Sequence, residues 1–143
     1  MNVYPLTRFH FEVEWGGSHI GFQEVTGLDF TTEVSEYRHG AMREHTKIKV
    51  AGMRTYSNIS LKRGILPLDN EFFQWWNSTE MDKPERRDIT IKMLNEQHQP
   101  VIVWQVKNAW PLSLKSTDLN ADDSGIAVET LEIAHEGLVM EHV

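Results

Sequence analysis

The chain has 143 residues, of which 40% are hydrophobic and 24% are charged, with a formal net charge of −7 and no cysteine. This length is about that of one domain, expected to span residues 1–143, and the composition excludes a disordered tail. No apolar run approaches the roughly 18 residues of a membrane-spanning helix, and the first residues lack a signal-peptide hydrophobic run, so we expect no membrane anchor. The lack of cysteine excludes disulfides and thiolate metal sites, and is compatible with assembly in a reducing cytoplasm.

Charge is distributed unevenly along the chain. Residues 1–115 contain 14 basic and 14 acidic residues, whereas residues 116–143 contain seven acidic residues and neither Lys nor Arg. Residues 38–54, in contrast, include five basic residues and one acidic residue, a net charge of +4. The acidic total argues against general binding to nucleic-acid duplexes, because such binding depends on neutralising phosphates.

Most of the chain alternates apolar and polar residues with the period of two that is typical of half-buried β-strands. In chain order, strands are expected over residues 9–15, 19–25, 31–37, 47–50, 58–62, 89–93, 102–106, 112–115 and 127–139. In the last of these, Leu131 and Ile133 occupy one face and Glu132 the other.

One segment departs from this alternation. Phe72, Trp75 and Trp76 follow the i, i+3, i+4 spacing of a helical stripe, which predicts a helix over 69–77 with Asp69 as its N-cap. The expected fold class is therefore all-β with one short helix packed on the core. Residues 38–46 have no core periodicity and predict a long polar loop, a type of segment that often carries function.

The sequence contains no recognisable catalytic or metal-binding motif. His135 and Glu136 begin like the H-E-x-x-H pattern of zinc proteases, but the second histidine position is occupied by Val139. His39 and His45 lack a third ligand. We therefore expect no enzyme, no metal and no cofactor, with a hydrolase whose acids meet only in the folded chain as an alternative.

The tryptophans allow a second functional interpretation. The four that could form a sugar-stacking platform are Trp75, Trp76, Trp104 and Trp110. Aromatic residues at core periodicity more often bury their large area, about 150–250 Å² each. The alternative function is a β-sandwich carbohydrate-binding or adhesion module that uses exposed tryptophans.

Six stretches together resemble the tail tube proteins of contractile phages and of phage-derived extracellular contractile injection systems. They are Phe22–Asp29, Glu36–Gly40, Ser57–Gly64, Phe72–Asn77, Asn108–Pro111 and Ile126–Gly137. The stretches occur in order and span nearly the whole chain. One departure lies at Gly40-Ala41-Met42, where relatives often carry a second glycine and an asparagine.

The resemblance implies a ring-forming protomer with a β-sandwich or barrel-like tail tube fold. Six such protomers would form a ring, and rings would stack into a hollow inner tube inside a contractile sheath. The implied partners are other copies of the chain, sheath protein, and baseplate and terminator proteins, with a cargo effector or DNA in the lumen. Assembly is expected in the cytoplasm, and the product is a phage tail or a released extracellular particle.

The uneven charge suggests which residues meet between subunits. Arg43, Lys47 and Arg54 are expected to face Asp118, Asp122 and Asp123 of another subunit. Arg38, His39 and Gly40 are expected at subunit contacts as well, because they belong to the long polar loop. Two alternatives are that the opposite charges pair within one chain, or that Glu129, Glu132 and Glu136 form a solvated anionic lining of the lumen.

Overall fold

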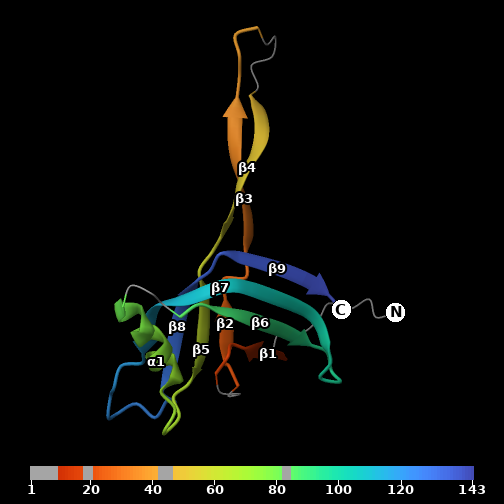
Figure 1. Ribbon diagram of the computed structural model, residues 1–143. Helices are drawn as coiled ribbons and strands as arrows, with labels where there is room; N and C mark the ends of the chain where they lie inside the picture. Colours follow the sequence, from red (N-terminus) through yellow and green to blue (C-terminus); the bar gives the residue numbers. More distant parts are fainter. Residues whose placement is uncertain (1–9, 18–20, 42–46, 82–84) are drawn as a thin grey trace.

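The computed structural model describes residues 10–17, 21–41, 47–81 and 85–143, which form a nearly all-β protein with one short helix, as expected (Figure 1). The strands are β1 (Phe11–Glu14), β2 (Glu24–Thr26), β3 (Phe30–Tyr37), β4 (Ile48–Tyr56), β5 (Ile59–Gly64), β6 (Arg87–Leu94), β7 (Pro100–Ser116), β8 (Val128–Ala134) and β9 (Gly137–His142). The helical segments are α1 (Glu71–Asn77) and the short 3-10 helix η1 (Ser78–Met81).

Seven of the described strands form one antiparallel sheet in the order β1-β6-β7-β8-β5-β2, with β9 also paired to β7. Strand β7 is 17 residues long and connects the two halves of this sheet. Its first half pairs with β6 and β9, and its second half pairs with β8. The prediction of separate strands at 102–106 and 112–115 is therefore wrong, because the chain continues through an irregularity between Pro111 and Ser113 instead of turning.

The long strand expected over 127–139 is divided into β8 and β9. These two strands follow one another along the same edge of β7 and are separated by His135 and Glu136. The N–H of Glu136 donates to the carbonyl of Lys107 at 2.9 Å, so the interruption remains hydrogen bonded to β7.

The core is built from rows of residues that face each other across neighbouring strands. Ile59 lies opposite Ile133 and Leu61 opposite Leu131, and all four side chains are buried. The alternate residues of the same strands lie on the other face, and most of them are polar. This polar face comprises Glu24, Thr26, Ser60, Lys62, Thr130 and Glu132.

Helix α1 closes the core on one side through an aromatic cluster. Phe72 and Trp75 are buried, and the ring of Trp15 meets that of Phe72 edge-on at a centroid distance of 4.9 Å. Trp76 is only half-buried, so the expectation that it shares the buried stripe is only partly correct. Aromatic contacts of this kind add to the stabilisation from area burial, which explains how a seven-residue helix is held in place.

Strands β3 and β4 pair only with each other among the described residues and form a second, two-stranded sheet. This hairpin projects from the body as a long arm, with residues 38–41 at its far end (Figure 1). Eight residues of β3 span about 26 Å at 3.3 Å per residue. The polar loop expected over 38–46 is thus the connection at the tip of the arm, and residues 42–46 lie outside the described part of the chain.

Candidate subunit interface

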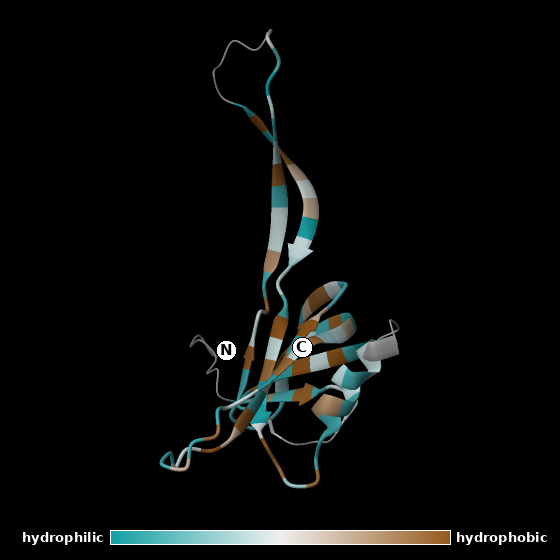
Figure 2. Cartoon of the chain, turned by 90° about the vertical axis from the view of Figure 1, so that its left-hand side faces the viewer, coloured by the Kyte–Doolittle hydropathy of each residue, from teal (hydrophilic) through white to brown (hydrophobic). Residues whose placement is uncertain are grey.

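The arm is the most exposed part of the described structure, yet it is rich in large apolar residues. Every residue of β3 is exposed, and in β4 only Tyr56 is half-buried. Hydrophobic bands alternate with hydrophilic ones along the arm, far from the core (Figure 2). The exposed large apolar side chains of the arm are Phe30, Val34, Tyr37, Ile48, Val50 and Met53.

The outer half of the arm has two different faces. Tyr37 lies opposite Ile48 and Ser35 lies opposite Val50, which places three apolar side chains on one face. The other face carries Glu36 opposite Lys49 together with Val34 opposite Ala51. The pattern changes at an irregularity between Thr32 and Val34, closer to the body. An amphipathic ribbon with no core beneath it has the composition of a surface that another molecule covers.

The root of the arm is fixed to the corner between β8 and β9. His135 Nε2 lies 3.1 Å from the carbonyl oxygen of Ser57, and since a carbonyl only accepts, Nε2 carries the proton. The rings of Tyr56 and His135 are 5.5 Å apart, and Asn58 Nδ2 donates to Glu132 Oε1 at 3.1 Å. These contacts anchor the arm to the body at its base, where it emerges.

The basic residues expected at a subunit contact lie on this arm. Arg38, His39 and Gly40 are exposed at its tip, and Lys47 and Arg54 are exposed on the β4 side. Lys47 Nζ lies 3.4 Å from Glu36 Oε2. Arg43, also expected at this contact, lies outside the described residues.

The acidic partners expected for them lie in the loop at 117–127, between β7 and β8. Asp118, Asp122 and Asp123 are all exposed there. The loop contains tight turns, because Asp123 Oδ1 accepts from the N–H of Gly125 at 2.8 Å and Asn120 Oδ1 accepts from the N–H of Asp122 at 3.0 Å. This loop and the arm tip lie at opposite ends of the protomer (Figure 1). The fold therefore does not bring the described charges of the two segments together within one chain.

The expectation that Glu129 lines a solvated lumen is wrong. Glu129 is only 9% exposed, and its Oε1 accepts from Arg63 Nε at 2.9 Å. It shares the core face of β8 with Leu131 and Ile133, two and four residues further along the strand. Glu132 is half-buried on the polar face.

Glu136, the third acid expected in the lumen, is exposed at the corner between β8 and β9. It accepts from Arg86 at 2.9 Å and from Asn108 Nδ2 at 2.8 Å. The lumen assignment of Glu132 and Glu136 remains a prediction.

Arg63 is the buried charged residue that the sequence analysis missed. Its side chain is 1% exposed, forms ion pairs with Glu129 and with Asp69 Oδ1 at 3.2 Å, and lies 3.9 Å from the centre of the Phe72 ring. The sequence contained a signal for this burial, because side chains alternate along a strand and Arg63 therefore lies on the same side of β5 as Ile59 and Leu61. Within the described residues this cluster holds the start of α1 against the sheet.

On the solvent-accessible surface of the body, several charges are paired with near neighbours. Lys92 Nζ lies 2.8 Å from Glu14 Oε1, and this hydrogen bond raises the pKa of Lys92 above its ordinary value. Lys62 Nζ lies 3.9 Å from Glu24 Oε2. These four charges on the body thus find partners within the protomer.

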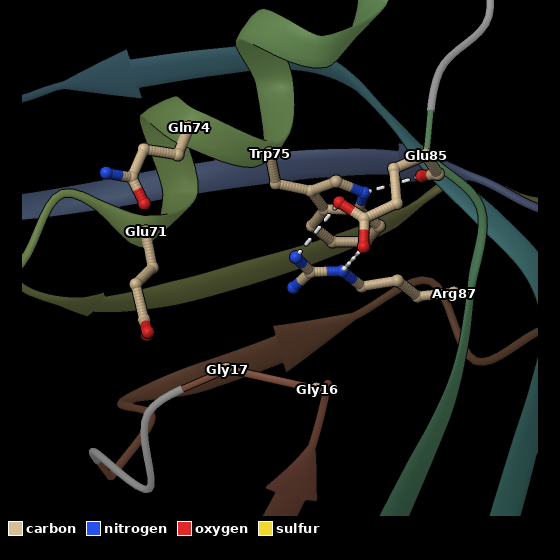
Figure 3. Close-up of a pocket in the computed structure, with 7 residues that line it drawn as sticks. All are labelled: Gly16, Gly17, Glu71, Gln74, Trp75, Glu85 and Arg87. Atoms are coloured by element: carbon tan, nitrogen blue, oxygen red, sulfur yellow. Dashed lines mark hydrogen bonds and ion pairs between the residues drawn. The ribbon is translucent and has the colours of Figure 1, made fainter.

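A small pocket lies beside α1. It is lined by Gly16, Gly17, Glu71, Gln74, Trp75, Glu85 and Arg87 (Figure 3). Arg87 donates to both carboxylate oxygens of Glu85 at 3.3 Å, and Trp75 Nε1 donates to the Glu85 carbonyl at 2.6 Å. The guanidinium also lies 4.7 Å from the Trp75 ring centre, so these groups stabilise one another.

The tryptophans do not form an exposed platform. Trp75 and Trp104 are buried, and Trp76 and Trp110 are half-buried. Among the residues described here, no group of three or more potential ligands could hold a metal ion, and neither helical segment is long and apolar enough to cross a membrane.

Comparison with known proteins agrees with this picture. The family model of the T4-like virus tail tube protein gp19 matches residues 7–139. No curated protein sequence matches the chain significantly. The chain belongs to the gp19 tail tube family, because the match spans almost its entire length.

Solved structures give the same assignment. The PVC sheath–tube complex of an extracellular contractile injection system contains a chain with 33% identity and a TM-score of 0.89, and the alignment covers 99% of this chain and 94% of that one. The tube-terminating cap of the anti-feeding prophage contains one with 29% identity and a TM-score of 0.91, covering 100% and 95%. Hcp1 from Flavobacterium johnsoniae, at 14% identity, 94% and 97% coverage and a TM-score of 0.59, shares the fold.

The protein is therefore a structural tube protein of a contractile tail or injection system. The carbohydrate-binding alternative is not supported, because neither the family nor the burial of the tryptophans favours it.

Proposed function

We propose that protomers pack side by side into six-membered rings that stack into a hollow inner tube. The observation that carries this proposal is the projecting arm, whose apolar residues have no cover within the described part of their own protomer. An isolated two-stranded hairpin is marginally stable at best, so an ordered arm of this length requires a surface to rest on. Neighbouring protomers supply that surface.

The energetic gain from covering the arm is large enough to matter. Its six large apolar side chains are between 47% and 75% exposed in the protomer. Full burial of such a side chain contributes about 1.5–3 kcal/mol, so covering the exposed part of all six contributes on the order of 5 kcal/mol per arm. Repeated around a ring, this term favours the assembled over the dispersed state.

The partners follow from the structures that this chain is similar to. Those structures are a sheath–tube complex, a sheath/tube terminator, a tube-terminating cap and, at 23% identity, a baseplate. A contractile sheath around the tube, a terminator at its end and a baseplate below are accordingly the proposed partners of this protein. The tube subunit acts as a conduit with no catalytic step of its own, and it assembles in the cytoplasm before joining a phage tail or a released particle.

The lumen is proposed to be lined by the polar face of β2, β5 and β8, which includes Glu132. This face carries hydroxyl groups and charges of both signs, so it stays hydrated and does not strongly retain a passing effector or DNA. Glu136 is proposed to lie at the rim of the same surface.

Negative-stain electron microscopy of the purified protein tests the proposal. Wild-type protein is expected to form rings and tubes. Ile48→Asp places a charge on the apolar face of the arm and is expected to give folded protomers without tubes, whereas Ile48→Val retains apolar surface and is expected to assemble. Compact monomers from the wild-type chain, or normal tubes from Ile48→Asp, would contradict the proposal.

A further inference from the structure

The two ends of the protomer carry opposite charge. Arg38, Lys47 and Lys49 lie at or near the tip of the arm, whereas the 117–127 loop contains three aspartates and no basic residue. The separation visible in Figure 1 means that these ends face away from each other along the length of the molecule. Neither strand pairing nor core packing requires this segregation.

Several of these charges have no ion-pair partner within the described part of their own protomer. Within the described residues, Arg38 and Lys49 form no ion pair, and neither do Asp118 and Asp122. Lys47 is the exception at the tip, through its exposed pair with Glu36. Exposed charges left without partners at both ends are available to a second molecule.

Apolar side chains accompany the charges at both ends. In the loop, Leu119 is 94% exposed and Ile126 is 84% exposed. At the arm, Tyr37 and Ile48 form part of the uncovered apolar face. The tip is basic and the loop is acidic, and both carry exposed apolar side chains. The two surfaces are therefore complementary in charge, and each offers apolar area for the other to cover.

We propose that the arm tip of one protomer docks on the 117–127 loop of a second copy of the chain, head to tail. This inference rests on the proposed tube and names the surface that receives the arm. Because the two ends are different surfaces, the contact is heterologous and can repeat from layer to layer without closing. The ring supplies several copies of each charge pair, so pairs that are weak individually act together.

Charge reversal tests this contact by sedimentation of tubes and electron microscopy. Arg38→Glu and Asp122→Lys are each expected to lower the fraction of protein in tubes by about fivefold or more, and the double variant is expected to recover it. Lys107→Glu, an exposed reversal on the body, serves as the matched control. Wild-type tubes are expected to weaken as salt rises from 0.1 to 1 M, where the Debye length falls from about 10 to 3 Å.

Carbodiimide cross-linking of wild-type tubes gives independent evidence, because it joins lysines to carboxylates in close contact. Mixed tubes of isotopically labelled and unlabelled protomers should yield cross-links between Lys47 or Lys49 of one protomer and an aspartate of the 117–127 loop of another. Tubes that tolerate both single reversals, or arm lysines that cross-link only elsewhere, overturn the docking while leaving the tube intact. Failure of wild-type protein to form tubes overturns the docking together with the proposed function.

Discussion

Arg63 and Glu129 form a 2.9 Å ion pair inside the sheet, directly opposite each other on β5 and β8. The pair continues the row of facing core residues formed by Ile59 with Ile133 and Leu61 with Leu131. Asp69 adds a second carboxylate, which pairs with Arg63 Nη2 at 3.2 Å. A buried charge is costly without partners, so this arrangement ties the loop before α1 to the sheet.

Removing one acid from this cluster is expected to destabilise the protomer. Glu129→Gln removes the charged hydrogen bond to Arg63 Nε and leaves the buried guanidinium paired with Asp69, so it should cost about 1.5–3 kcal/mol. Glu132→Gln changes an acid on the opposite face of the same strand and should cost about 1 kcal/mol or less. Urea denaturation of dispersed protomers measures both free energies of unfolding. Equal losses for the two variants would show that the pair is not structurally important.

The helix offers a second matched comparison between adjacent phenylalanines. Phe72 is buried against Trp15 and Arg63, whereas Phe73 is about half exposed. Phe72→Ala should cost about 3–5 kcal/mol because it opens a cavity in the core. Phe73→Ala should change stability by about 0.5 kcal/mol or less. Chemical denaturation distinguishes them, and a similar loss at both positions would contradict the burial described for α1.

Gly27 lies three residues before the arm begins and is expected to tolerate no side chain. Its φ is +92°, and a Cβ there would collide with the carbonyl oxygen of Asn58. Gly27→Ala should therefore cost about 2 kcal/mol or more, beyond the 1–2 kcal/mol of the left-handed conformation. Gly64→Ala, where nothing lies within 4 Å of the added Cβ, is the control and should be nearly neutral. Thermal unfolding of both variants checks this, and an unchanged melting temperature for Gly27→Ala would refute it.

The sequence predicted the fold class because period-two alternation and one i, i+3, i+4 stripe are local signals. It could not predict that residues 100–116 form one strand, since whether a chain turns or continues at Pro111 depends on the neighbouring strands. The prediction that Glu129 lines the lumen relied on its charge and did not take its position along the strand into account. Because side chains alternate along a strand, Glu129 faces the core together with Leu131 and Ile133. By the same alternation, its partner Arg63 faces the core together with Ile59 and Leu61.

The arm shows which feature of the interface could not be predicted from the sequence. Ile48 and Val50 alternate with lysines in the way of a half-buried strand, and they are exposed in the protomer. Alternation indicates that one face of a strand is covered, but it does not show whether the cover comes from the same chain. The charge segregation between the arm and the 117–127 loop was visible in the sequence, whereas their position at opposite ends required the structure.

The most direct test of the central claim is hydrogen exchange of the arm in tubes and in dispersed protomers. The Ile48→Asp variant supplies the dispersed reference. We expect amides in residues 30–37 and 48–56 to exchange markedly more slowly in tubes, because neighbouring protomers cover them, while the core amides of β5 and β8 change little. Equal exchange of the arm in both states, with protection confined to the body, would contradict the account.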